Sequence, residues 1–266
     1  MSASKSKKIA VVTGASAGIG AVYAERLAAR GYDLVLVARR AERLEALSAK
    51  VSKTYGTKVE VIDADLTKEV DLTRVEKVLA TDPAVRILVN NAGNATLAPI
   101  AQTSAEDAAS MIALNVTALT RLTQAVLPAF LSRNAGVIIN VASVLSLHSL
   151  PISSIYSGTK GYVLNFSRGL QEELADTGVK LQVVLPASTA TEIWDLSGVP
   201  LAALNQDTVM TAENLVDAAL AGFDKGEAIT LPSVADASLW DKYDAARSTL
   251  FAATQTGQPA PRYKAA

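Results

Sequence analysis

A tyrosine and a lysine four positions apart are the side chains best suited to do chemistry. Tyr156 and Lys160 lie in a stretch of helical spacing, and residues four apart share one face of a helix. Free tyrosine has a pKa of about 10, so proton exchange at neutral pH needs a stabilised phenolate, which a neighbouring ammonium provides by electrostatic attraction. Ser143, at the end of a predicted strand, is placed to orient a substrate oxygen. Together they predict a proton-transfer site, although each alone also fits an amphipathic helix pair or a turn.

A fourth polar residue interrupts an apolar helical pattern. Asn115 stands between Leu114 and Val116 within the predicted helix 105–133. Asparagine is a poor helix former, so its presence there is consistent with a role in holding a water behind Lys160. A core amide with internal hydrogen bonds is the alternative.

A glycine-rich segment, Thr13 to Gly20, follows the first predicted strand and opens the first predicted helix. Glycines permit unusual dihedrals and bring backbone N–H groups close to phosphate oxygens, while the amino terminus of the helix adds positive potential. The segment predicts a dinucleotide pyrophosphate site, although tight strand-to-helix turns also use glycine for geometry alone. The predicted contacts are Gly14, Ser16, Gly18, Ile19 and Gly20.

The end of the second predicted strand bears on the choice of cofactor. An acidic residue there would bind the ribose 2′-hydroxyl of NAD and repel a 2′-phosphate. Here the strand leads into Arg39 and Arg40, and a guanidinium can clamp a phosphate with two hydrogen bonds. NADP(H) is therefore favoured over NAD(H), unless the two arginines merely begin a solvated helix.

Two further strand ends carry polar or small residues. Asp65 and Leu66 follow the third strand, where Asp65 can accept a hydrogen bond from the adenine amino group or, alternatively, cap the next helix. Asn91, Ala92 and Gly93 follow the fourth strand, where small residues let a cofactor ribose pass near the backbone. By itself this second motif is only a turn signal.

The elements that must position these residues alternate between strand and helix. Strands are expected at 9–12, 34–37, 59–62, 87–89, 137–141, 181–185 and 229–231, and helices at 19–30, 40–55, 68–79, 105–133, 154–176 and 212–223. This alternation predicts an α/β fold, a Rossmann-like, doubly wound parallel sheet of about seven strands with helices on both faces. Ser104 with Asp107 is expected to begin a helix, and Gly31, Gly136 and Gly178 to end helices. The aperiodic segment 186–206 is expected to be a mobile flap over the site, with a surface insertion as the alternative.

Composition sets limits on the class of protein. With 266 residues, of which 50% are hydrophobic and 19% charged, the chain is expected to form one domain, 1–266. A net charge of −1 gives no sign of a nucleic-acid or membrane partner. The absence of cysteine and the single histidine argue against a metal site. The polar start, without a signal peptide, and the lack of a membrane-spanning apolar run predict a cytoplasmic protein.

Taken together, the motifs closely resemble those of the classical short-chain dehydrogenase/reductase (SDR) family, and the resemblance covers essentially the whole chain. The matching segments are the glycine motif 13–20, the Asn-Asn-Ala-Gly motif 90–93, and the catalytic set Asn115, Ser143, Tyr156 and Lys160. The resemblance implies hydride transfer between a nicotinamide and a carbon bearing the reacting oxygen, with Tyr156 as acid or base. It also implies that Lys160 binds the nicotinamide ribose. Pro186, Ala187, Thr189 and Thr191 would then hold the carboxamide, with Ala187 standing where the family usually has glycine.

The resemblance also implies a substrate pocket built from 94–99, 144–155 and the flap, with mainly apolar side chains. The expected enzyme is an NADP-dependent carbonyl reductase or alcohol dehydrogenase acting on a small-molecule ketone or secondary alcohol. Two alternatives stay open: a non-catalytic dinucleotide-binding regulator, and a reductase of a carrier-bound 3-oxoacyl group. Family members commonly pair the helices that correspond to 105–133 and 154–176, so a homo-oligomer, dimer or homotetramer, is expected.

Overall fold

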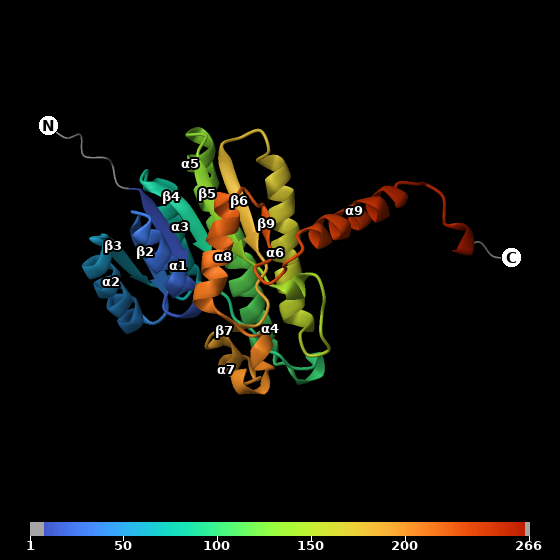
Figure 1. Ribbon diagram of the computed structural model, residues 1–266, viewed down its shortest axis with the longest axis horizontal. Coiled ribbons are helices and arrows are strands. Elements are labelled where there is room, and N and C mark those ends of the chain that lie inside the picture. Colours follow the sequence, from blue (N-terminus) through green and yellow to red (C-terminus); the bar gives the residue numbers. More distant parts are fainter. Residues whose placement is uncertain (1–7, 264–266) are drawn as a thin grey trace. The chain divides into compact units, whose positions relative to one another are not determined.

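The computed structural model describes residues 8–263, which fall into two compact units (Figure 1). The first unit ends at Pro232 and the second begins at Ser233. The expectation of a single domain stays a prediction.

The first unit is built on a seven-stranded sheet in which every described pairing is parallel. Its strands are β1 (Ile9–Thr13), β2 (Asp33–Ala38), β3 (Val59–Asp63), β4 (Val85–Asn90), β5 (Gly136–Val141), β6 (Val179–Val184) and β9 (Ile229–Thr230). They are arranged in the order β3-β2-β1-β4-β5-β6-β9, so the direction of winding reverses between β1 and β4. Ligands of open α/β sheets bind outside the carboxyl ends of the strands at this switch point. The predicted Rossmann-like sheet is confirmed.

Burial of the strands explains why they were recognisable in the sequence. Every residue of β2 is buried, as expected for an inner strand of a parallel sheet with both faces covered. Among the described residues, the edge strand β3 pairs only with β2, and it leaves Glu60 and Asp63 exposed. Its weaker apolar pattern therefore reflects its edge position.

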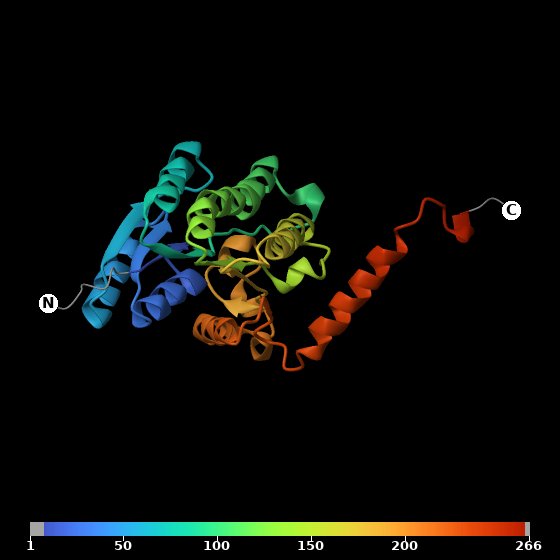
Figure 2. The same cartoon turned by 90° about the horizontal axis from the view of Figure 1, so that it is seen from above.

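Helices cover both faces of the sheet (Figure 2). α1 (Gly18–Ala29) contacts both α2 (Ala41–Tyr55) and α8 (Ala212–Asp224) on one face. On the other face α3 (Glu69–Thr81) packs against α5 (Leu119–Ser132), and α4 (Ala105–Ile112) packs against α6 (Ser154–Glu173). Two bidentate ion pairs join α1 and the residue that follows it to α8: Arg26 with Asp217, and Arg30 with Asp224.

The expected helix 105–133 is not uniform. A π-helical turn, Ala113–Ala118, separates α4 from α5, and Asn115 lies within it, buried. π-helical turns are rare and often accompany functional sites because they re-aim the side chains around them. The helical spacing in the sequence did not reveal this turn.

The segment 186–206 is more ordered than its lack of periodicity predicted. It contains the short strand β7 (Thr189–Ala190), the five-residue helix α7 (Ile193–Ser197) and a 3₁₀ turn, Leu201–Ala203. β7 pairs in parallel with β8 (Met210–Thr211) to form a separate two-stranded sheet. The backbone N–H of Leu97 donates to Ser197 O, which ties the segment to the loop after β4. Its mobility stays a prediction.

The second unit contains α9 (Ser238–Ala253), none of whose residues is buried. Its large apolar side chains Leu239, Tyr243, Leu250 and Phe251 are exposed. Within residues 8–263, no helix is long and apolar enough to cross a membrane.

Candidate active site

The three residues of the predicted proton-transfer site lie together at the carboxyl end of β5. Ser143 follows β5 and is buried, and its hydroxyl is hydrogen-bonded to that of Tyr156 on α6. The ammonium Nζ of Lys160, one helical turn further on, lies 5.7 Å from the centroid of the Tyr156 ring. The structure therefore brings together the hydroxyl, phenol and ammonium that proton exchange with a bound oxygen requires.

Lys160 is buried, and its ammonium donates a hydrogen bond to a backbone carbonyl. Nζ donates to the backbone O of Val141 at 3.0 Å, and 6% of the residue is exposed. Burial lowers the pKa of Lys160 to about 8, because the ammonium loses its hydration. At neutral pH the side chain is still charged.

The pKa of Tyr156 is raised to about 12, chiefly by burial, while the hydrogen bond with Ser143 lowers it in part. The phenol is therefore protonated at neutral pH. A protonated phenol is the form that an acid needs in order to give its proton to a carbonyl oxygen.

Asn115 is fixed by hydrogen bonds to two segments. Its Oδ1 accepts from Asn94 N at 3.0 Å, and its Nδ2 donates to Asn94 O at 2.9 Å. The same Nδ2 donates to Thr159 Oγ1 at 3.1 Å, and Thr159 Oγ1 donates in turn to Tyr156 O at 2.7 Å. The side-chain amide thus joins the loop after β4 to the helix that carries Tyr156. The proposed water behind Lys160 stays a prediction.

Asn94 and Thr159 were not among the predicted catalytic residues, although the sequence held a partial signal for each. Asn94 directly follows the Asn-Asn-Ala-Gly motif, and Thr159 directly precedes Lys160. A Cβ added at Gly93 would lie 3.2 Å from Asn115 Oδ1 and 3.5 Å from Lys160 Nζ. Gly93 therefore leaves space beside both side chains.

The glycine-rich turn and the Asn-Asn-Ala-Gly motif meet at the switch point of the sheet. Thr13 Oγ1 accepts from the backbone N–H groups of Asn91 and Ala92, both at 3.0 Å. Asn91 Nδ2 donates to Thr13 O at 2.9 Å. The Asn91 side chain therefore ties two loops together. Thr13, which positions both motifs, was not among the predicted site residues.

Three glycines allow this turn to form. A Cβ at Gly14 would lie 2.8 Å from Asn91 Nδ2, and one at Gly20 would lie 2.3 Å from Gly14 O. Gly18 has a φ of 53°, and a Cβ there would lie 2.9 Å from Thr191 Cγ2. Only glycine permits these approaches without displacing a neighbour.

The amino terminus of α1 fits an anionic ligand. Within the described part of the chain, no side chain caps this helix, and its first turn carries no acidic residue. Its terminal N–H groups and the positive end of the helix dipole suit a pyrophosphate. The residues of the turn therefore fit a dinucleotide, and Ile19 and the half-buried Ser16 stand beside it.

The two arginines after β2 differ in their surroundings. Arg40 donates from Nε and Nη2 to Ser16 Oγ, at 3.2 and 3.1 Å, and from Nη1 to Glu192 Oε2 at 2.7 Å. Arg43 Nη1 donates to Glu192 Oε1 at 2.6 Å. Arg39 is exposed and, between residues 8 and 263, has no described hydrogen bond or ion pair. The structure brings Ser16 and Arg40, two of the predicted cofactor contacts, together and adds Arg43 and Glu192, which the sequence analysis missed. Their contacts with a cofactor stay a prediction.

Asp65 uses its carboxylate locally. Oδ1 accepts from Thr67 N at 3.0 Å and from Thr67 Oγ1 at 2.7 Å. Although burial raises the pKa of Asp65, these hydrogen bonds and the nearby charge of Arg39 lower it on balance. Helix α3 begins four residues later, so Asp65 forms a turn and does not itself cap the helix. The contact of Asp65 with adenine stays a prediction, and so does the contact of the buried Leu66 with the cofactor.

The segment after β6 accommodates Ala187 without strain. Among the described residues, Asn134 is the single non-glycine residue with a positive φ, so Ala187 does not adopt the left-handed conformation that would favour glycine. Pro186 O accepts from Val144 N at 2.9 Å. Thr189 Oγ1 donates to Ala187 O at 3.0 Å, and Thr191 lies against Gly18. The expected cofactor segment therefore reaches the glycine turn despite the substitution.

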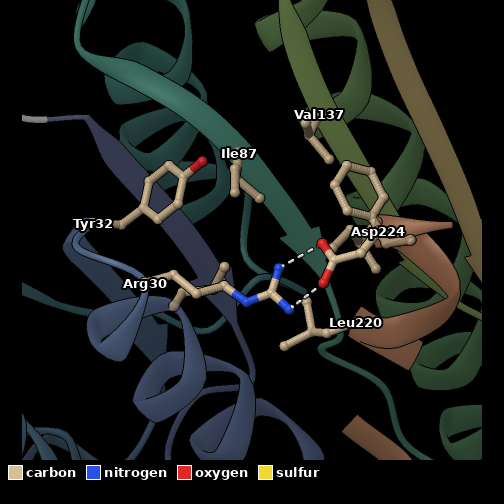
Figure 3. A pocket seen from close by; sticks show the side chains of 9 residues that line it. Arg30, Tyr32, Ile87, Val137, Leu220 and Asp224 are labelled. Carbon is tan, nitrogen blue, oxygen red and sulfur yellow. Dashed lines mark hydrogen bonds and ion pairs between the residues drawn. The ribbon is translucent and has the colours of Figure 1, made fainter. Parts of the chain in front are cut away.

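Two hollows are described on the first unit. One, of about 430 Å³, is bordered by 145–149 and by Ser154, Ser157 and Gly158 on α6; the exposed His148 lines it. The other, of about 300 Å³, lies near the amino ends of β4 and β5, beside Ile87 and Val137 (Figure 3). Its edge carries the Arg30–Asp224 ion pair. The second hollow is at the opposite end of the sheet from Tyr156, so it does not serve the proton-transfer site.

Comparison with known proteins identifies the family. A model of the short chain dehydrogenase family matches residues 8–198, well over half of the chain. The chain belongs to the short-chain dehydrogenase/reductase family.

Two solved structures are similar to this chain over nearly its whole length. A short-chain dehydrogenase from Sphingobium yanoikuyae in complex with NADPH is 46% identical, with a TM-score of 0.93, and the match covers 96% of this chain and 100% of that chain. A bulky-bulky ketone specific alcohol dehydrogenase from Comamonas testosteroni is 38% identical, with a TM-score of 0.90, and the match covers 98% of this chain and 100% of that chain.

Curated relatives match over a shorter part. A very-long-chain 3-oxoacyl-CoA reductase-B from Danio rerio is 38% identical over 73% of this chain and 63% of its own length. The 17-beta-hydroxysteroid dehydrogenase type 3 of Homo sapiens is 39% identical over 68% of this chain and 59% of its own length. The chain thus spans less than two thirds of the length of these relatives.

Proposed function

We propose that this protein is an NADP(H)-dependent oxidoreductase that interconverts ketones and secondary alcohols, with Tyr156 as the acid in reduction and the base in oxidation. The observation that carries the proposal is the contact between the Tyr156 and Ser143 hydroxyls, with Lys160 Nζ 5.7 Å from the tyrosine ring. Bound NADPH would supply the hydride. The protein supplies the proton and the orientation of the substrate.

The residues divide this work between them. Ser143 orients the substrate oxygen by a hydrogen bond, and Tyr156, protonated at neutral pH, gives that oxygen its proton. The Lys160 ammonium favours the phenolate that is left behind. Asn115 and Thr159 are positioning residues, because they hold the helix turn that carries Tyr156.

The cofactor is NADP(H), held by the glycine turn, Arg39, Arg40 and the segment after β6. Support comes from the exposed guanidinium of Arg39, from the lack of a carboxylate at residues 38–40, and from the NADPH complex of the Sphingobium relative. A cytoplasmic location and a homo-oligomeric state stay predictions.

The substrate we favour is a ketone with two bulky apolar substituents, in keeping with the name of the Comamonas enzyme. The predicted pocket segments contain four half-buried apolar residues, Leu97, Val144, Leu145 and Trp194. A 3-oxoacyl thioester is the second candidate, because relatives such as the Danio protein carry that name. Comparing kcat/KM for a 3-oxoacyl-CoA with that for a diaryl ketone separates the two.

Replacing Tyr156 by phenylalanine tests the mechanism. We expect kcat for ketone reduction to fall at least about 100-fold, because the proton donor is lost, with an unchanged melting temperature. Tyr162→Phe is the matched control: it removes a hydroxyl from the same helix, where Tyr162 contacts Thr120 Oγ1 at 2.9 Å. Activity of Tyr156→Phe within severalfold of wild type refutes the assignment.

The cofactor is tested by the ratio of kcat/KM for NADPH to that for NADH. We expect wild type to prefer NADPH, and Arg39→Gln to lower the ratio about 10- to 100-fold by removing a charge-assisted hydrogen bond to phosphate. The value for NADH alone should stay within about twofold, which separates lost phosphate binding from misfolding. A wild-type preference for NADH overturns the assignment.

A further inference from the structure

A carboxylate lies between two guanidinium groups where the sequence predicts a phosphate. Glu192, which immediately precedes α7, contacts Arg40 through Oε2 at 2.7 Å and Arg43 through Oε1 at 2.6 Å. Arg40 directly precedes α2 and Arg43 lies in its first turn, whereas Glu192 lies some 150 positions further along the chain. The two ion pairs therefore join the 186–206 segment to the end of β2.

The donors of Arg40 are already in use in this arrangement. Nε and Nη2 both point to Ser16 Oγ, and Nη1 points to Glu192. A guanidinium has five N–H donors, and a two-pronged contact with phosphate needs two of them on one edge. A phosphate at the Nε–Nη2 edge of Arg40 would therefore displace Ser16 Oγ, and one that uses Nη1 would lie beside the Glu192 carboxylate.

We propose that Glu192 is a specificity-determining residue that competes with the 2′-phosphate of NADP(H) for Arg40 and Arg43. The inference rests on the proposed cofactor. A phosphomonoester carries a charge of about −1.5 to −2 near pH 7, so a phosphate bound at Arg40 would place a second anion beside the Glu192 carboxylate. The two anions repel each other, and one of them must give way.

The ion pairs are suited to displacement. The side chains of Arg40, Arg43 and Glu192 are between 42% and 49% exposed, so water and salt weaken their attraction. When Glu192 is displaced, the 186–206 segment loses its ties to α2. Thr191, next to Glu192, lies against Gly18 and keeps its own contact with the glycine turn.

The test measures binding of two cofactor fragments to the full chain without turnover. Calorimetry gives dissociation constants for 2′,5′-ADP, which carries the 2′-phosphate, and for 5′-AMP, which lacks it. Glu192→Gln keeps the shape of the side chain and removes its charge, and Glu192→Ala removes the acceptor. Glu42→Gln is the matched control, because Glu42 is an exposed carboxylate in the first turn of the same helix α2.

We expect both Glu192 variants to bind 2′,5′-ADP about three- to tenfold more tightly than wild type, since a competing state reduces apparent affinity by the fraction of sites that it occupies. The dissociation constant of 5′-AMP for the Glu192 variants should stay within about twofold of wild type. The dissociation constants of both fragments for Glu42→Gln should do the same. If wild type prefers 2′,5′-ADP but neither Glu192 variant binds it more tightly, the competition is refuted and the proposed cofactor stands. If wild type does not distinguish the two fragments, the proposed cofactor fails, and this inference fails with it.

Discussion

Replacing Thr159 by valine removes one oxygen from the link between Asn115 and Tyr156 and keeps the shape of the side chain. The lost oxygen accepts from Asn115 Nδ2 at 3.1 Å and donates to Tyr156 O at 2.7 Å. Asn115 is 1% exposed, so water does not replace the missing acceptor. We expect the amide to shift and the turn of α6 that carries Tyr156 to lose its support.

The size of both effects follows from these contacts. An unsatisfied buried donor costs about 1–3 kcal/mol, which for a chain of this size lowers the melting temperature by roughly 2–12 °C. Displacement of a reacting group by a fraction of an ångström lowers kcat, and we expect about a tenfold loss. The KM for NADPH should stay within about twofold, because no predicted cofactor contact is removed.

Thr123→Val provides the matched control. Thr123 Oγ1 is also fully buried and accepts from an asparagine amide, that of Asn90, at 3.1 Å. The other N–H of that amide donates to Asn140 Oδ1 at 3.0 Å, so the valine leaves one donor unsatisfied there as well. Thermal melts and steady-state ketone reduction are measured for both variants. Equal losses of stability with equal kcat values would refute the positioning role of Thr159.

Two further predictions concern the glycine turn and the buried lysine. Gly18→Ala and Gly31→Ala each place alanine at a positive φ, 53° and 86°, and should each lower the free energy of unfolding by about 1–2 kcal/mol. Only Gly18→Ala should also raise the KM for NADPH, because its Cβ would displace Thr191, whereas the Cβ of Gly31→Ala meets open space. Equal KM values for the two variants would contradict this. For Lys160, a pKa lowered from 10.5 to about 8 means that the cost of burying the ammonium is full below pH 8 and is lost as pH rises to about 10.5. Lys160→Met should therefore abolish activity yet raise the free energy of unfolding by about 1–3 kcal/mol at pH 7, and by less at pH 10. Denaturant titrations measure this, and a variant less stable than wild type at pH 7 would contradict the reasoning.

The sequence was sufficient for the sheet because its inner strands are buried on both faces and read as continuous apolar runs. Sequence signals predicted a helix boundary correctly where one short-range hydrogen bond fixes it. At Ser104, Oγ accepts from Asp107 N and caps α4. Gly31 has the expected left-handed conformation after α1. Gly136 was wrongly expected to end a helix, because it begins β5 and Asn134 takes the left-handed conformation after α5 instead.

The parts that were missed depend on distant or weak signals. Strands β7 and β8 have two residues each, too few to show a period of two. The π-helical turn around Asn115 changes the backbone hydrogen bonds more than the spacing of apolar residues, so the pattern looked like a plain helix. The pairing of Glu192 with Arg40 joins residues far apart in sequence, and one carboxylate in an aperiodic segment gives no sign of its partner. Helix α9 buries none of its residues, so it left no clear apolar stripe.

The conformation of Ala187 has a consequence for related enzymes. Because this position adopts a negative φ, its methyl group adds no strain to the folded chain, yet it restricts the backbone when the chain is unfolded. An alanine at such a site stabilises a protein by about 0.4–1 kcal/mol relative to glycine, through the entropy of the unfolded state. In those enzymes of this family whose glycine after the corresponding proline also has a negative φ, replacement by alanine should therefore raise heat resistance and leave the residues around the tyrosine untouched.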